Sequence, residues 1–152
     1  MKLKISFNKV LMERWKEHLA AAGCRVTRPR QVVMQVLEQA EGPLSAQEVL
    51  ERGRQVYPAL GLVTVYRALA LFAGLGLVRR VHGEGECHGY VPASPGHCHA
   101  VVCRTCGRAV EFAGSEDLEG LIARVEAETG YRVDGHLLQL FGFCAECQEG
   151  EP

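Results

Sequence analysis

The chain has 152 residues, of which 47% are hydrophobic and 23% are charged. These are ordinary values for a globular protein, and they exclude a disordered or collagen-like chain. Its apolar runs are far shorter than the roughly 20 residues needed to span a bilayer, and charges interrupt the N-terminus before the apolar core of a signal peptide could form. We therefore expect a cytoplasmic protein with no membrane partner.

The net charge of −1 hides an uneven distribution of charge along the chain. Residues 1–80 contain 13 Lys and Arg against 6 Glu and no Asp, a balance of +7. Residues 81–152 contain 4 Arg against 12 Asp and Glu, a balance of −8. This division favours a nucleic-acid-binding module joined to a part that attracts cations. The alternative is that the charges only cover solvent-exposed faces and have no binding role.

The basic half predicts four helices. An amphipathic pattern over 8–22 is closed by Gly23, and Pro29 is placed as the first residue of a second helix. The run from Ser45 to Glu48 is a capping box, which predicts a third helix up to about residue 56. Thr64 is placed to cap a fourth helix that ends at residues 74–76.

Two short strands at 77–81 and 89–91 should follow these helices. Helices followed by a hairpin are the layout of a winged helix-turn-helix domain, with 45–56 and 64–74 as the turn pair. Other small helical domains share this spacing. On this layout we assign the winged-helix DNA-binding domain to residues 1–91.

The acidic half predicts a small α/β domain, so the whole fold is α+β. Residues 92–96 (PASPG) form the predicted linker, and residues 97–152 form the second domain. Strands are expected at 100–102, 109–112 and 131–141. A helix at 116–129 should begin at a Ser115 cap, end at Gly130 and point its apolar side chains inward, namely Leu118, Leu121, Ile122 and Val125.

Four of the seven cysteines form two Cys-x-x-Cys pairs: Cys103 with Cys106, and Cys144 with Cys147. In a cytoplasmic chain such pairs are more typical of metal sites than of disulfides. Each pair closes a tight turn, and together they supply the four thiolates of a tetrahedral structural zinc site. A redox dithiol is the alternative, but it would not need two motifs and no thioredoxin-like pattern accompanies them.

A second group of possible ligands lies just upstream: His82, Glu84, Glu86, Cys87, His88, His97, Cys98 and His99. On a strand, His97 and His99 point to one side and Cys98 to the other. Two imidazoles with carboxylates nearby suit zinc, iron or manganese, and a Cys87 thiolate would favour zinc. Glu111 and His136 are further candidates, and exposed polar residues of no binding role remain the alternative.

The predicted fourth helix carries Tyr66 and Arg67 near its N-terminus, the end that a recognition helix presents to the major groove. Arg pairs with guanine, and Tyr reaches phosphate or a thymine methyl group. The alternative is that Tyr66 packs in the core and that Arg67 is only a surface charge. Thr64, Arg28 and Arg30 complete the predicted DNA-contacting set. The chain has no HExxH, GxSxG or phosphate-loop motif.

Five motifs make the sequence recognisable: Gly23-Cys-Arg-Val-Thr-Arg-Pro-Arg, Leu44-Ser-Ala-Gln-Glu-Val, Gly61-Leu-Val-Thr-Val-Tyr-Arg-Ala-Leu, Cys103-Arg-Thr-Cys-Gly and Gly142-Phe-Cys-Ala-Glu-Cys. In order and spacing they resemble the ferric uptake regulator family over about residues 20–148. The resemblance implies dimeric, metal-responsive repressors with an N-terminal winged helix. It implies a hinge linker at residues 92–96 and a metal-binding dimerisation domain at residues 97–152. It also implies that Tyr66 and Arg67 contact DNA and that the paired cysteines hold structural zinc.

The sensing site departs from the family's pattern. Pro43-Leu44 stands where members usually have a histidine before the third helix. The family's hinge histidines lie three and five residues before the first zinc cysteine, and Ala100 and Cys98 occupy those places. Here His97 and His99 lie six and four residues before it.

Two assignments of the sensing residues therefore stay open. The resemblance implies a site in the dimerisation domain made by His97, His99, Glu119 and His136. It also implies a hinge site made by Cys87, Glu111 and His82 or His88, which would share a histidine with the first if the register slips. A cysteine in the sensing region resembles the zinc uptake regulators more than the iron or peroxide sensors.

We interpret the chain as a homodimeric repressor that binds a two-fold-symmetric, double-stranded DNA operator when a regulatory metal is bound. Zinc is favoured over iron or manganese for that metal, and no small-molecule substrate is expected. An iron-, manganese- or peroxide-responsive regulator is the alternative within the family. A zinc-dependent or thiol enzyme is the alternative of a different class.

Overall fold

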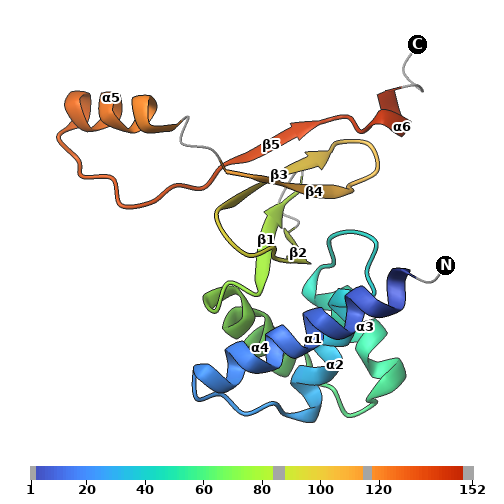
Figure 1. Ribbon diagram of the computed structural model, residues 1–152. Coiled ribbons are helices and arrows are strands. Elements are labelled where there is room, and N and C mark those ends of the chain that lie inside the picture. Colours follow the sequence, from blue (N-terminus) through green and yellow to red (C-terminus); the bar gives the residue numbers. More distant parts are fainter. Residues whose placement is uncertain (1–2, 84–87, 115–117, 149–152) are drawn as a thin grey trace.

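The computed structural model describes residues 3–83, 88–114 and 118–148 and has the expected α+β fold (Figure 1). The first four helices lie at one end of the molecule, and a three-stranded sheet lies at the other end with the last two helices; a two-stranded hairpin lies between the two ends. The elements in chain order are α1 (Leu3–Ala21), α2 (Arg28–Glu38), α3 (Ala46–Val56), α4 (Leu62–Gly74), β1 (Val78–His82), β2 (His88–Pro92), β3 (Cys98–Cys103), β4 (Ala109–Ala113), α5 (Glu119–Thr129), β5 (Gln139–Gly142) and α6 (Ala145–Gln148).

The main hydrophobic core lies within the helical end. The rings of Trp15 from α1 and Phe72 from α4 lie 5.2 Å apart between centroids, and both side chains are fully buried. Leu37 of α2 and Val49 of α3 complete the contact between the four helices. Each large side chain buried in this way contributes about 1.5–3 kcal/mol to folding. This core positions α4 against the other three helices.

The structure confirms the capping box that starts α3. The Glu48 amide donates to Ser45 Oγ at 3.2 Å, and the Ser45 amide donates to Glu48 Oε2 at 2.7 Å. These bonds stabilise the ionised form of Glu48 and lower the pKa of its carboxyl group. The capping-box motif therefore predicted the correct start of α3, because Ser45 and Glu48 lie within one helical turn of each other.

Three of the first four helices start at residues other than those predicted. The first helix begins at Leu3 rather than at residue 8, and Arg28 rather than Pro29 is the first residue of α2. Proline is tolerated one position later because the amide there also lacks a partner within the helix. Thr64 does not cap α4: Gly61 takes that place with an extended backbone, and its carbonyl accepts the Val65 amide at 3.1 Å.

The wing is an antiparallel hairpin of β1 and β2, each within one residue of its predicted bounds. It is attached to the segment before α3, where Leu44 and Tyr90 exchange two backbone hydrogen bonds of 3.1 and 2.8 Å. A Cβ at Gly89 would lie 2.4 Å from the Pro43 Cβ, so this approach requires glycine. With the helices, the hairpin completes a winged-helix arrangement.

The C-terminal sheet has the order β4-β3-β5, with β3 antiparallel to β4 and parallel to β5. The predicted strand at 131–141 is wrong for its first part, because residues 131–138 form no strand and only β5 is regular. The Val133 amide instead donates to Glu126 Oε1 of α5 at 2.8 Å, which holds this return segment (residues 131–138) beside the helix.

The helix predicted at 116–129 begins at Glu119 and ends, as expected, at Gly130 with a left-handed backbone. The proposed Ser115 cap lies outside the described residues, and Leu118 takes the N-cap position without a side-chain bond. The inward orientation of its apolar residues is not found, since α5 buries none of them and Leu121 is 46% exposed. In Figure 1, α5 lies to one side of the sheet.

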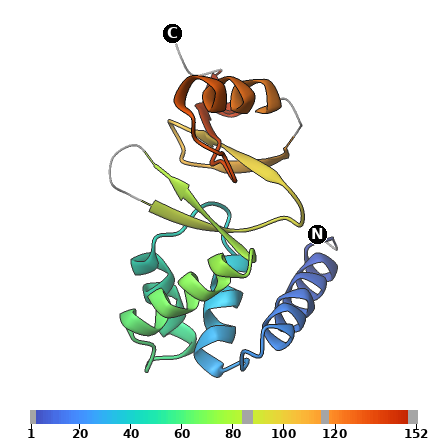
Figure 2. The same cartoon turned by 90° about the vertical axis from the view of Figure 1, so that its left-hand side faces the viewer.

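The wing contacts the C-terminal sheet directly (Figure 2). Val81 of β1 packs with Ala100 and Val102 of β3 in a second, small apolar cluster. The Gln139 side chain of β5 accepts the His82 amide at 2.9 Å and donates to the His82 carbonyl at 2.6 Å. The predicted domain boundaries stay a prediction. None of the described helices is long and apolar enough to cross a membrane.

Candidate metal centres and nucleic-acid interface

The two Cys-x-x-Cys pairs meet at one end of the sheet. Cys103 ends β3 and Cys144 follows β5, and these strands are parallel neighbours with Cys103 opposite Gly142. The four sulfur atoms lie within 4.8 Å of one another, with 3.8 Å between those of Cys106 and Cys144. The pairing predicted from the sequence is therefore found, and a soft, four-thiol donor set suits tetrahedral zinc.

The electrostatics of this cluster favour a bound cation. Backbone amides of Cys106 and Cys144 donate to the Cys103 sulfur and lower the pKa of its thiol to about 6. A hydrogen bond to the Cys144 side chain, together with burial, raises the pKa of Cys147 to about 12. Four thiolates at this spacing repel one another, so a dication is the group that allows all four to ionise.

An ion pair joins the two cysteine turns from outside. Arg108 Nη1 and Nη2 donate to the two carboxylate oxygens of Glu146 at 3.1 and 3.0 Å. The pairing raises the pKa of Arg108 and lowers the pKa of Glu146. Both side chains are largely exposed, so their contribution to stability is small, but the fork geometry sets how the turns face each other.

A second cluster consists of His97, His99 and His136, whose ring nitrogens lie within 4.8 Å of one another. The Nε2 atoms of His97 and His136 are 3.0 Å apart, and the His97 and His99 rings are 4.7 Å apart between centroids. His97 directly precedes β3, His99 lies in β3, and His136 lies in the segment before β5. The expectation that His97 and His99 share one face is confirmed.

The surroundings of these imidazoles favour metal binding. His99 is buried, and burial followed by the neighbouring His97 and His136 lowers its pKa, which keeps the ring neutral and able to ligate. A Cβ at Gly114 would lie 2.0 Å from His97 Cδ2, so glycine leaves the space that this ring occupies. The three nitrogens could hold one cation.

Other predicted ligands do not join this cluster. Glu119 begins α5 and is not among the grouped ligands of the described chain. Cys87 lies outside the described residues, as do Glu84 and Glu86. The His82 backbone is bonded to Gln139, and it is not grouped with other ligands in the described chain.

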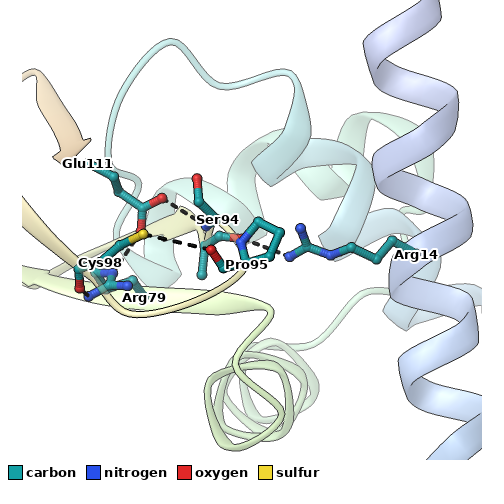
Figure 3. A network of polar contacts seen from close by, with 7 residues as sticks. Arg14, Arg79, Ser94, Pro95, Cys98 and Glu111 are labelled. Atoms are coloured by element: carbon teal, nitrogen blue, oxygen red, sulfur yellow. Dashed lines mark hydrogen bonds and ion pairs between the residues drawn. The ribbon is translucent and has the colours of Figure 1, made fainter. Parts of the chain in front are cut away.

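Glu111 makes two contacts that the sequence did not predict. Its Oε1 accepts Arg79 Nε at 2.8 Å and its Oε2 accepts the Ser94 amide at 2.8 Å (Figure 3). Both oxygens are therefore used within the chain, and Glu111 joins neither ligand cluster. Sequence reasoning missed Arg79, because its partner lies 32 residues away and no local pattern connects them.

The α4 helix has one buried face and one exposed face. Val65, Leu69 and Phe72 are buried in the core, whereas Thr64 and Arg67 are exposed and Tyr66 is 53% exposed. Half exposure excludes the alternative in which Tyr66 is a core residue. An exposed Tyr-Arg pair on the second helix of the turn pair is suited to reading a DNA groove.

The two basic residues of α2 differ in their contacts. Arg28 is exposed at the first position of the helix. Arg30 is half-buried and donates from Nη1 to the Arg25 carbonyl at 2.6 Å. Arg28 is therefore the better placed of the two to reach a phosphate group.

Comparison with known proteins gives a consistent result. The model of the "Ferric uptake regulator family" matches residues 21–141. The ferric uptake regulation protein of Shigella flexneri is 34% identical over 136 residues, covering 88% of this chain and 91% of that protein. The zinc uptake regulation protein of Mycobacterium tuberculosis (strain CDC 1551 / Oshkosh) is 35% identical over 130 residues, covering 86% and 99%.

Among solved structures, a zinc uptake regulator complexed with zinc and DNA superposes with a TM-score of 0.78 at 26% identity, covering 93% of this chain and 95% of that one. These relatives are transcription regulators and not enzymes, which removes the zinc-dependent or thiol enzyme as an interpretation. The matched model, these relatives and the winged-helix fold together show that the chain belongs to the ferric uptake regulator family of metal-responsive DNA-binding regulators.

Proposed function

We propose that this protein is a zinc-responsive repressor, a homodimer that binds a two-fold-symmetric operator when zinc is bound by His97, His99 and His136. The observation that carries the proposal is the donor set of this cluster, which contains three imidazoles and no carboxylate within the described chain. Three histidines with an open position are a frequent zinc environment, whereas manganese prefers oxygen ligands.

Iron is the closer competitor, since imidazole also suits Fe²⁺. The relatives do not separate the two metals, because a ferric and a zinc uptake regulation protein match at 34% and 35% identity. The affinity order of divalent metals for nitrogen sites places zinc above iron, which supports zinc here. The four-cysteine cluster would hold a structural zinc through Cys103, Cys106, Cys144 and Cys147.

The dimer interface is proposed at the C-terminal end. Large apolar side chains are exposed there on β4, α5, the return segment, β5 and the residue after it, namely Val110, Leu121, Tyr131, Leu137, Leu140, Phe141 and Phe143. Exposed apolar surface of this extent is typical of association sites. Both edges of the β4-β3-β5 sheet are also unpaired within the described chain. The proposed DNA contacts are Tyr66, Arg67, Thr64, Arg28 and Arg30.

The test is DNA binding titrated with each metal. Chain purified without chelator would first be analysed for zinc, and an operator would be selected from random duplexes. Operator affinity is then measured against buffered free Zn²⁺, Fe²⁺ and Mn²⁺. We expect the response at the lowest free concentration with zinc. Iron or manganese acting below zinc would identify a regulator of that metal, and no response to any metal would refute metal control.

A matched pair of variants tests the site itself. His136→Ala should raise the zinc concentration needed for operator binding, because two imidazoles remain of three. His18→Ala is the control, since His18 is an exposed histidine of α1 outside both clusters. An unchanged zinc response in His136→Ala would remove the three-histidine cluster as the sensor.

A further inference from the structure

A cavity of about 380 Å³ lies between α1, the start of β1 and the linker at residues 92–96. This volume is at the lower end of the roughly 300–1,000 Å³ that is usual for small-molecule sites. None of the residues that line it belongs to the four-cysteine or the three-histidine cluster. The cavity is therefore separate from both candidate metal centres.

The charge on the wall of this cavity is positive. Arg14 from α1 and Arg79 from β1 both line it, and no Asp or Glu of the described chain does. Arg79 is paired with Glu111 outside the wall, at 2.8 Å, whereas the half-buried Arg14 makes no ion pair within the described chain. Because a charge removed from water needs a partner, an anion in the cavity would stabilise Arg14.

Both arginines keep hydrogen-bond donors that the fold does not use. Arg14 Nη2 donates to the Ala93 carbonyl at 2.8 Å (Figure 3), but its buried Nε has no acceptor within the described chain. Arg79 uses Nε for Glu111 and Nη1 for the Cys98 carbonyl, which leaves its Nη2. Guanidinium groups bind phosphate oxygens through pairs of donors. The bond to Ala93 also holds Arg14 in place before a ligand arrives, which lowers the entropy cost of binding.

The rest of the wall suits the organic part of a small ligand. Val78 is buried beside the cavity, and Pro95 offers an exposed apolar ring from the linker. Gly76 and Gly96 also line it, with φ of +68° and +90°. These left-handed backbones favour glycine, so no side chain fills the space at either position.

The cavity lies away from the proposed DNA contacts. Gly76 follows the C-terminal end of α4, whereas Tyr66 and Arg67 lie in its N-terminal half. Between Arg67 and Gly74 the helix advances by about 10 Å, at about 1.5 Å per residue. A duplex held at Tyr66 and Arg67 does not require a phosphate in this cavity, which favours a free molecule as its occupant.

We propose that this cavity binds a small phosphate monoester, with its phosphate group held by Arg14 and Arg79 and its organic part against Val78 and Pro95. The bound molecule would bridge α1 to β1 and the linker, because each of these segments supplies part of the wall. The inference goes beyond the proposed function and does not depend on the zinc response of the histidine cluster.

The experiment is a calorimetric titration of the full-length, zinc-loaded chain with glycerol 3-phosphate, after excess metal has been dialysed away. Glycerol is the matched ligand without a phosphate group. Arg14→Gln and Arg79→Gln are compared with the wild type and with Arg80→Gln. Arg80 is the exposed neighbour of Arg79 on β1 and does not line the cavity, so its loss removes the same charge without the contact. His136→Ala is added because a phosphate group could also bind a metal at the histidines.

We expect saturable binding of glycerol 3-phosphate to the wild type and no binding of glycerol. In Arg14→Gln and Arg79→Gln the affinity should fall by about tenfold or more, the usual loss when a hydrogen bond to a charged group is removed. Arg80→Gln and His136→Ala should bind within about twofold of the wild type, because neither change touches the cavity.

The inference is overturned if the wild type shows no saturable binding at millimolar glycerol 3-phosphate, or if Arg80→Gln loses as much affinity as Arg14→Gln. Loss of binding in His136→Ala with full binding in Arg14→Gln would place the phosphate on a metal instead. Operator DNA that displaces the ligand competitively would assign the cavity to the DNA interface and would also overturn it. A chain that binds the phosphate ester but shows no zinc-dependent DNA binding would refute the proposed function alone.

A second variant keeps the test decisive if Arg14→Gln fails to fold by circular dichroism. Ser94→Asp adds a carboxylate to the cavity wall from an exposed position of the linker, where a side chain is easily accommodated. Its negative charge should repel the phosphate group and abolish binding. Wild-type affinity in Ser94→Asp would refute the site.

Discussion

Replacement of Arg67 by alanine tests whether α4 reads bases or only contacts phosphates. Arg67 is exposed beside Tyr66, on the face opposite the buried Val65 and Leu69. Alanine is the best helix former, so the helix and its core contacts should persist. The change therefore removes a guanidinium from the proposed interface without altering the scaffold that presents it.

The expected loss follows from the chemistry of the contact. An arginine paired with a base edge accounts for roughly 1–3 kcal/mol of discrimination. A two-fold-symmetric dimer makes the contact twice, giving roughly 2–6 kcal/mol. At about 1.4 kcal/mol per tenfold, operator affinity should fall by at least about 30-fold, up to roughly 20,000-fold.

The assay is fluorescence anisotropy on the selected operator and on a scrambled duplex, each at several salt concentrations. Arg124→Ala is the control, because Arg124 is an exposed residue of α5 and its loss changes the net charge equally. The prediction requires a larger loss on the operator than on the scrambled duplex. Equal losses, with the salt slope reduced by about one for each contact, would show a phosphate contact, and unchanged binding would remove α4 from the groove.

Three further predictions concern the scaffold that carries α4. Phe72→Ala should destabilise the winged helix by about 3–5 kcal/mol, because Phe72 is fully buried against Trp15; chemical denaturation followed by tryptophan fluorescence measures this, and a loss below about 1 kcal/mol would contradict the packing. Ser45→Ala should cost about 1 kcal/mol through the lost cap of α3. Glu48→Gln should be destabilising at neutral pH, and its difference from the wild type should shrink as pH falls from 4.5 through the lowered folded-state pKa of Glu48, since that carboxylate stabilises the fold only when ionised.

Features that depend on near neighbours in the chain could be predicted from the sequence. The capping box at Ser45 and Glu48 closes within four residues, and Gly130 ends α5 with a left-handed backbone as its position indicated. The two Cys-x-x-Cys pairs predicted a single four-thiol site, because each pair forms a local turn and four thiolates are typical of a structural zinc site. Thr64 was misassigned because Gly61 offered an extended backbone three residues earlier, which a list of good capping residues does not reveal.

Features that depend on distant partners could not be predicted. The contact between Glu111 and Arg79 joins two strands 32 residues apart in the chain, so no local pattern indicated it, and the predicted ligand role of Glu111 stays a prediction. The return segment was expected to continue a strand, but its Val133 amide bonds to Glu126 of α5 instead. The apolar side chains of α5 were expected to be buried within the chain, and α5 buries none of them, which is consistent with the proposed dimer interface.

The two metal clusters share the same pair of strands, and this predicts an asymmetry between their variants. His99 and Cys103 lie in β3, whereas His136 precedes β5 and Cys144 follows it. The parallel pairing of β3 with β5 therefore brings the ligands of each cluster together. Cys144→Ser should release the zinc that fastens this pairing, so it should destabilise the sheet, weaken the dimer and also lower metal affinity at the histidines. His136→Ala removes a ligand from a segment without regular structure and should leave the four-cysteine zinc, the fold and the dimer unchanged. Zinc content, melting in chelator and sedimentation of both variants would measure this, and a Cys144→Ser protein that stays folded and dimeric in chelator would refute it.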